Sequence, residues 1–411
     1  MKKLIALVLI GCSVFSLAGC AKNPPGLGPG EVEIVMWLIG SEAQALTIKE
    51  LAGKFYQDTK IKVRCEAISW GDAHSKYFTS IAGGVAPDIG TLGLTWGTEF
   101  GNLGAVVDLN EAYPEETKAI KESIFPGLRS SIEYKGRIFG IPFDMTEYVL
   151  YYRSDLISKA PATWDELANL LAELGKKNKG MLFDWGSMSW IGYSPFLWQA
   201  GGDFYNADYS RVTIDSPEAV TALKFFAGLY TRYDVPKTKI PLEQGMRTGD
   251  FPIAISGNWK IDGLRLSAPE IEGKWSIAMM PAGPTGKRTA FIGGRIMGIF
   301  TQSKHKKESW MFIKYLFSSE IQKKLYEAAL KKDDTYLPPV RKTWDLLNMD
   351  DRFKDVLVMQ ANDSKGPPPV ANWDSNTKYI DEAIQKVILQ NADPRRELKV
   401  AQDQLTSALN E

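Results

Sequence analysis

Histidine is scarce in this chain of 411 residues, and the formal charge is zero. Only His74 and His305 occur. Their scarcity disfavours a histidine-rich metal site and a Ser-His-Asp triad, although chemistry based on carboxylates stays open. Lysine plus arginine and aspartate plus glutamate both number 49. The balance gives no reason to expect nucleic acid or another highly charged polymer as a partner. We expect neither a metal nor a cofactor.

Cysteine is scarce as well, with Cys12, Cys20 and Cys65. The first two fall in an N-terminal targeting segment, so Cys65 is left alone and the body of the protein cannot form an internal disulfide. Cys65 sits in the alternating apolar stretch 61–68. This position favours a buried small side chain over a reactive thiol.

Long apolar runs are missing after the first 20 residues; the short run 290–301 contains Arg295. Residues 4–14 form an apolar segment of signal-peptide length behind two lysines, and the sequence LAGC at 17–20 resembles a bacterial lipobox. We expect residues 1–20 to be a lipoprotein signal with Cys20 as the lipidated N-terminus, and residues 21–30, rich in proline and glycine, to be a tether. The body would be soluble and held on the outer face of the cytoplasmic membrane, or in a periplasm if the cell has two membranes.

Strand and helix patterns alternate at the start of the body. Strands are predicted over 31–38 and 61–68 and at 89, and helices over 41–59 and 72–82. A hairpin is predicted over 134–142 and a strand over 148–153. Further helices are predicted over 163–177, 216–231, 306–316, 319–330 and 376–389, the first with a capping box and the second with proline at its first position. The order indicates an α/β fold with a largely parallel sheet.

Several short motifs follow one another along residues 31–344. They are Trp70-Gly71-Asp72, 83–89 (GGVAPDI), 103–109 (LGAVVDL), 140–142 (GIP), 150–156 (LYYRSDL), 161–167 (PATWDEL), 201–204 (GGDF), 255–259 (ISGNW), 280–284 (MPAGP), Gly293-Gly294 and 337–341 (LPPVR). In this order they resemble the family 1 extracellular solute-binding proteins, the maltose- and sugar-binding group of bacterial ABC importers.

The resemblance implies a periplasmic-binding-protein-like α/β fold with two lobes, hinge crossovers and a ligand cleft between the lobes. It implies a first lobe of 31–142 plus 290–336 and a second lobe of 143–289 plus 337–411. It also implies a monomeric binding protein, not an enzyme, that captures a carbohydrate, closes on it and delivers it to the importer's permease subunits.

A sugar site needs aromatic platforms for the ring faces and polar side chains for the hydroxyls. Twelve tryptophans are available. Trp37 and Trp70 end predicted strands, where α/β folds place ligands. Trp259 occupies the position of the family's stacking aromatic, among small residues. The remaining aromatic candidates are Trp96, Trp185, Trp190, Trp198 and Trp373.

The polar candidates are Glu42, Asp72, Asp144, Asp203 and Arg295, with Gln44 and Thr146 as neighbours of two of them. Asp144 follows the expected first crossover and is the preferred hydroxyl acceptor. The family's acidic residue shortly after Asp88 is missing, and Trp96 is a candidate to compensate for it. Arg295 replaces the family's aromatic after the two glycines, where it either donates to hydroxyls or forms a surface ion pair.

Two other functions stay open at this point. The same fold could bind a peptide, an anion or another charged solute, and the positive charge of Arg295 leaves a charged ligand open. A lipid-anchored glycoside hydrolase would need two opposed carboxylates, which a sequence rich in acids cannot exclude. The tryptophan content favours carbohydrate over both.

Overall fold

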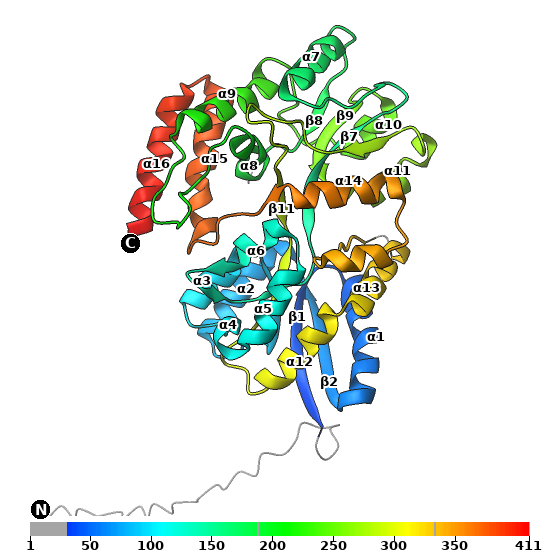
Figure 1. Cartoon of the computed structure of the whole chain (residues 1–411), viewed down its shortest axis with the longest axis vertical. Helices are drawn as coiled ribbons and strands as arrows, with labels where there is room; N and C mark the ends of the chain where they lie inside the picture. The colour runs from blue at the N-terminus through cyan, green and yellow to red at the C-terminus, as the bar shows by residue number, and fades with distance from the viewer. Residues whose placement is uncertain (1–30, 187–188, 333, 411) are drawn as a thin grey trace, which may run out of the picture.

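The computed structural model describes residues 31–186, 189–332 and 334–410, which fold around two separate β-sheets (Figure 1). The expected signal peptide 1–20, its Cys20 and the tether 21–30 lie outside the described residues. We call the sheet that contains the first strand, with its helices, the first lobe, and the other sheet with its helices the second lobe. Among the described residues, no helix combines the length and the apolar character needed to cross a membrane.

The first lobe has a five-stranded sheet in the order β2-β1-β3-β12-β6. Its strands are β1 (Val32–Ile39), β2 (Ile61–Ile68), β3 (Ile89–Gly93), β6 (Ile141–Pro142) and β12 (Arg295–Ile299). The first three pair in parallel and β12 runs antiparallel to β3. Its helices are α1 (Glu42–Thr59), α2 (Trp70–Ala82), α3 (Trp96–Asn102), α4 (Leu109–Ala112), α5 (Pro114–Ser123), α6 (Pro126–Ile132), α12 (Lys306–Phe317) and α13 (Ser319–Lys331). All five residues of β3 are buried, as expected for a parallel strand covered on both faces.

The second lobe has a six-stranded sheet in the order β13-β11-β7-β9-β8, with β10 paired to β7. Its strands are β7 (Thr146–Tyr152), β8 (Met181–Phe183), β9 (Ile253–Gly257), β10 (Ser276–Ala278), β11 (Ala290–Gly293) and β13 (Ser364–Lys365). Its helices are α7 (Trp164–Gly175), α8 (Ser189–Gln199), α9 (Pro217–Thr231), α10 (Leu242–Thr248), α11 (Lys260–Ser267), α14 (Asp351–Asn362), α15 (Trp373–Gln390) and α16 (Pro394–Asn410). A short 3-10 turn, Pro269–Ile271, follows α11.

Local sequence signals explain most helix starts. The side chain of Ser41 accepts a hydrogen bond from the backbone N–H of Gln44. Thr163 and Ser216 likewise accept hydrogen bonds from the backbone N–H groups of Glu166 and Ala219. The cap predicted at the start of the helix 163–177 is therefore confirmed. The helix predicted over 72–82 begins earlier, at Trp70, because the hydroxyl of Ser69 caps it and donates to Asp72 at 2.6 Å. The predicted hairpin is confirmed as a short one, with β4 (Glu133–Tyr134) and β5 (Arg137–Ile138) joined at the expected turn.

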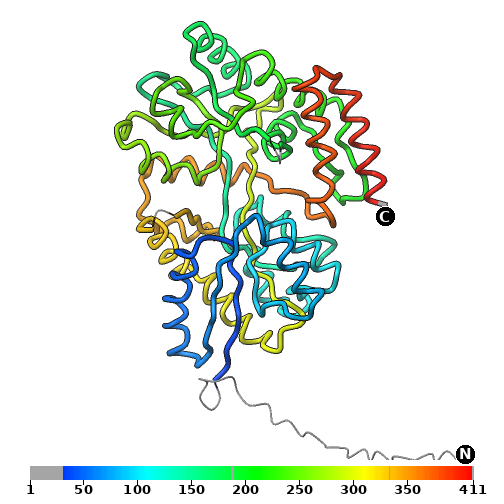
Figure 2. Tube along the Cα trace, turned by 180° about the vertical axis from the view of Figure 1, so that it is seen from behind, coloured from blue at the N-terminus to red at the C-terminus, as the bar shows by residue number. Residues whose placement is uncertain are grey.

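The chain crosses between the lobes at three places, and Figures 1 and 2 show these crossings from opposite sides. The first joins β6 to β7, and the second joins β11 to β12 at Gly294. Gly294 has a φ of 138°, and a Cβ atom there would collide with the carbonyl oxygen of Asp144. Only glycine fits this position without strain.

The sequence predicted that the second and third crossings lie at about residues 290 and 337. In the structure both crossings lie later in the chain. Residues of β11 pair with β7, so Ala290–Gly293 belongs to the second sheet. The 3-10 turn Arg341–Leu346 packs on the first lobe instead, because its Trp344 is buried against Phe125 and Val340 bridges Ile124. The third crossing therefore precedes α14.

Candidate functional site

A cavity of about 500 Å³ lies between the two lobes, and we call it the hinge pocket. The first lobe contributes the end of β1 and the start of α1 and α2, and the second lobe contributes β7 and the segment after β9. The crossing segments and the loop after α13 complete the wall. The lining residues are Gly40, Ser41, Gln44, Trp70, Asp144, Met145, Thr146, Trp259, Gly294, Arg295, Asp334 and Thr335. The strand and helix ends that α/β folds use for ligands therefore meet here.

A second cavity of about 620 Å³ lies beside the hinge pocket and is lined by residues of the second lobe. We call it the side pocket; Thr146 and Trp259 line both cavities. Its wall includes Trp185, Tyr148 and Phe291, together with charged side chains of both signs on the loops before α8 and α10 and at the start of α11. The two cavities therefore lie next to each other, with Trp259 and Thr146 in the wall of both.

The floor of the hinge pocket is a buried ion pair between Asp144 and Arg295, whose side chains are almost fully covered. The carboxylate accepts hydrogen bonds from the Arg295 backbone at 2.8 Å and from its Nε at 2.9 Å, and a third from Nη2. Nη1 of the same guanidinium donates to the carbonyl of Ile39 and to Gln44. The guanidinium also lies over the ring of Phe143. The pair thus connects the first two crossings to the end of β1. Its two charges neutralise each other within the protein.

The polar rim on the first-lobe side is also cross-linked. Asp334 accepts hydrogen bonds from the Ser41 hydroxyl at 2.7 Å and from the Gln44 amide at 2.9 Å. These contacts hold the loop after α13 against the start of α1. Ser41 and Gln44 line the hinge pocket, and hydroxyl and amide groups can both donate and accept hydrogen bonds, which suits the hydroxyl groups of a neutral ligand.

Three indoles face the cleft. Trp259 is 37% exposed and Trp70 is 52% exposed, unusual values for a side chain of this size. The ring of Trp259 lies over Gly257, where any Cβ atom would collide with it, and its centroid is 6.0 Å from that of Tyr148. Trp185 is half-buried and rests on Tyr230. The side chains of Trp70 and Trp259 come from different lobes and line the same pocket.

Three predicted tryptophans occupy the core of the second lobe instead. Trp190, Trp198 and Trp373 are at most 4% exposed, and the rings of Trp190 and Trp373 meet edge to face at 5.1 Å. This placement corrects the expectation that they form the cleft wall, because the helices α8 and α15 turn these side chains toward each other. Asp203 accepts a hydrogen bond from the Trp198 indole and pairs with Lys365, so its carboxylate has a structural role.

The remaining predicted residues surround the cleft without lining the hinge pocket. Trp37 packs under α2, between Tyr77 and Lys76. Glu42 is exposed at the start of α1, and Asp72 serves in the cap of α2. The indole of Trp96 lies behind Trp70, edge to face at 5.9 Å between ring centroids.

Several lining residues carry no signal that predicts them from the sequence, chiefly Ser41, Met145, Asp334 and Thr335. Asp334 and Thr335 stand just before the 337–341 motif, which is the one signal that could have drawn attention to them. Their contacts to α1 join positions about 290 residues apart, and such long-range packing leaves no local pattern.

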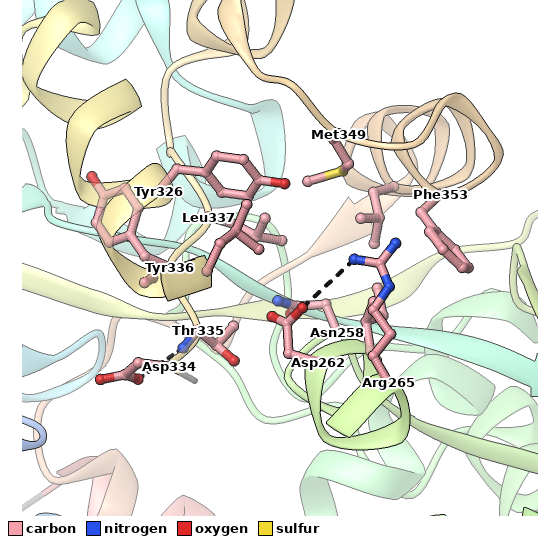
Figure 3. Close-up of a pocket in the computed structure, with 14 residues that line it drawn as sticks. Asn258, Asp262, Arg265, Tyr326, Asp334, Thr335, Tyr336, Leu337, Met349 and Phe353 are labelled. Atoms are coloured by element: carbon pink, nitrogen blue, oxygen red, sulfur yellow. Dashed lines mark hydrogen bonds and ion pairs between the residues drawn. The ribbon is translucent and has the colours of Figure 1, made fainter. Parts of the chain in front are cut away.

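A narrow crevice lies on the other side of the Asp334–Thr335 segment, between α11, α13 and α14 (Figure 3). Asp262 and Arg265 of α11 point toward each other there, the Arg265 guanidinium lies over the ring of Phe353, and Met349 also lines the crevice. Its volume of about 30 Å³ matches roughly one water molecule. A sugar ring cannot enter it, so the site is the wider cleft.

Comparisons with known proteins agree with this architecture. A binding protein of Brucella abortus is 24% identical over 98% of this chain and 97% of its own length. The diacetylchitobiose binding protein DasA of Streptomyces coelicolor is 23% identical, with 82% of each chain covered. The structure of the sugar-binding protein MalE from Xanthomonas citri superposes with a TM-score of 0.82 at 23% identity, covering 92% of this chain and 98% of that one.

The last of these likenesses shows the two-lobed fold that the sequence predicted. A family model described as bacterial extracellular solute-binding protein matches residues 50–355, about three quarters of the chain. These residues include most of the first lobe, the first two crossings and the cleft residues of β7 and β9. The chain therefore belongs to the family of bacterial extracellular solute-binding proteins.

Proposed function

We propose that this protein captures a neutral oligosaccharide in the interlobe cleft and delivers it to an ABC importer. The observation that carries the proposal is the pair of partly exposed indoles, Trp70 and Trp259, which line one pocket from opposite lobes. Flat aromatic faces in a concave site with nearby hydroxyl and amide groups suit the C–H faces and hydroxyl groups of sugars. The sugar-binding relatives support the same ligand class.

The charges of the hinge pocket favour a neutral ligand over an anion. Every hydrogen-bonding nitrogen of the Arg295 guanidinium donates within the protein, to Asp144, Ile39 or Gln44. A phosphate or carboxylate ligand would have to displace Asp144 from this buried pair, at a cost of several kcal/mol. Arg295, which kept the anion hypothesis open in the sequence, therefore supports the floor of the site.

The same internal pairing weakens the hydrolase hypothesis. The two carboxylates that line the hinge pocket, Asp144 and Asp334, are held by Arg295 and by Ser41 and Gln44 respectively. A glycoside hydrolase needs one carboxylic acid and one carboxylate free to face the scissile bond. We propose binding without hydrolysis, so a bound oligosaccharide should be returned intact after prolonged incubation.

The length of the cleft favours a ligand of more than one sugar ring. The hinge pocket and the side pocket meet at Trp259, and Trp185 lies farther along the second. We infer that one sugar ring sits between Trp70 and Trp259 and that the chain continues toward Trp185. Closure of the lobes around the crossings at Asp144 and Gly294 would then present the loaded form to a permease, while acyl chains on Cys20 would keep the protein at the membrane.

The test is a thermal-shift screen against neutral oligosaccharides, with charged sugars and peptides as alternatives. A ligand that binds only the folded protein raises the melting temperature by mass action. The shift should disappear in Trp259→Ala and persist in Phe78→Ala, a matched control on α2 that is 53% exposed and outside both cavities. A shift with peptides or anions alone would overturn the carbohydrate assignment.

A further inference from the structure

A contact between the lobes lies beside the cleft at Asp374, the second residue of α15. Its carboxylate accepts hydrogen bonds from the Thr95 hydroxyl at 3.0 Å and from the indole nitrogen of Trp96. Thr95 and Trp96 begin α3 in the first lobe, whereas α15 packs on α8, α9 and α16 in the second lobe. In Figures 1 and 2 these two helices lie on the same flank of the molecule, away from the crossing strands.

Each end of this contact is fixed by its own lobe. On the second-lobe side, the neighbouring Trp373 is 1% exposed and packs against Trp190 and Phe204. On the first-lobe side, the Trp96 ring lies against Gly93, where an added Cβ atom would stand about 3.0 Å from the indole. The carboxylate therefore joins two elements that are each anchored in a core.

The Trp96 ring in turn supports the cleft wall. Its edge-to-face neighbour is Trp70, whose own side chain is half exposed in the hinge pocket. The ring of His74 also meets the Trp96 ring edge to face, with 5.0 Å between ring centroids, and its Nε2 is hydrogen-bonded to Glu99 at 3.0 Å. A carboxylate that fixes the indole N–H thus also fixes the ring on which Trp70 rests.

We propose that Asp374 is a positioning residue for ligand binding: it fixes Trp96 across the lobe boundary and, through Trp96, sets the position of the Trp70 platform. This inference rests on the proposed function, since it assumes that Trp70 contacts the ligand. Part of the affinity then comes from a contact between lobes that does not touch the ligand.

The first test needs no ligand. The protein is labelled with 5-fluorotryptophan, and the ¹⁹F signals of Trp70 and Trp96 are assigned by their loss in Trp70→Phe and Trp96→Phe. Asp374→Ala should shift both signals, whereas Glu382→Gln, at an exposed acid on the same helix, should shift neither. Asp374→Asn, which keeps one acceptor oxygen, should restore the Trp96 signal in part. Unchanged Trp70 and Trp96 signals in Asp374→Ala would overturn the proposal.

The second test uses an oligosaccharide that raises the melting temperature of the wild-type protein. Asp374→Ala should weaken its binding about tenfold by calorimetry, the effect of losing one charge-assisted hydrogen bond that positions the Trp70 platform. Trp96→Phe should weaken it similarly, and the double variant should be no weaker than either single one. Additive losses would contradict the coupling. If no sugar binds the wild-type protein, the proposed function fails, while the fluorine result still decides whether Asp374 positions the two indoles.

Discussion

Replacement of Trp259 by alanine should remove a large part of the sugar affinity. A tryptophan side chain can bury up to about 250 Å², and Trp259 is 37% exposed without ligand. About 90 Å² is therefore available for a sugar to cover. At about 25 cal/mol per Å² this area corresponds to about 2 kcal/mol, a rise of about 30-fold in Kd. Because the ring rests on Tyr148 and Gly257, the free protein should also lose about 1–2 kcal/mol of stability.

The assay is isothermal titration at a temperature where both proteins are fully folded, so that the stability loss does not enter the measured Kd. Trp259→Phe keeps an aromatic face and should lose less affinity than Trp259→Ala. Phe78→Ala, exposed on α2, should leave Kd unchanged. An unchanged Kd in Trp259→Ala would refute the reasoning, because it would mean that the ligand does not cover the exposed face of this indole.

Three further predictions concern the residues around the cleft. Arg295→Ala should lower the free energy of unfolding by about 3–5 kcal/mol in urea titrations, because Asp144 would stay buried without its partner; a loss below about 1 kcal/mol would contradict the buried pair. Trp198→Ala should cost about 3–5 kcal/mol of stability while the folded protein keeps its sugar affinity, and a loss of affinity without a loss of stability would place this residue in the cleft wall. Burial raises the pKa of Glu147 well above its usual 4.5, so the folded protein holds this proton more tightly than the unfolded one. The free energy of unfolding should therefore fall as the pH rises from 4.5 toward that raised pKa, and Glu147→Gln should reduce the fall. If the wild-type protein and Glu147→Gln lose stability identically with pH, the raised pKa of Glu147 is contradicted.

The sequence predicted the elements whose signals are local. Helices with serine or threonine caps appear where expected, and the alternation of strands and helices indicated the α/β class. Trp70, Trp259, Asp144 and Arg295 line the hinge pocket, because the motifs that carry them lie at strand ends and crossings. The lobe boundaries are less local, since they depend on which sheet a strand joins, and β11 joins the second sheet through pairing with β7.

The errors share a physical cause. Trp190 lies near glycine and serine in the sequence, which made it look like a loop residue beside a ligand. The structure buries it through contacts with Phe204, Phe291 and Trp373, and two of these are more than 90 residues away. Asp334 was missed for the same reason, since its role follows from contacts with Ser41 and Gln44 across the first lobe. Side-chain direction and distant partners, not composition, decide between core and cleft.

The central claim is that the cleft holds a neutral oligosaccharide. The most direct measurement is calorimetric titration of the wild-type protein with neutral oligosaccharides and with charged sugars and peptides, at low and high salt. The account predicts binding of one neutral oligosaccharide per chain with a Kd that changes little with salt, because the ligand carries no charge for the salt to screen. Binding of a charged ligand alone, with a Kd that rises strongly with salt, would contradict it.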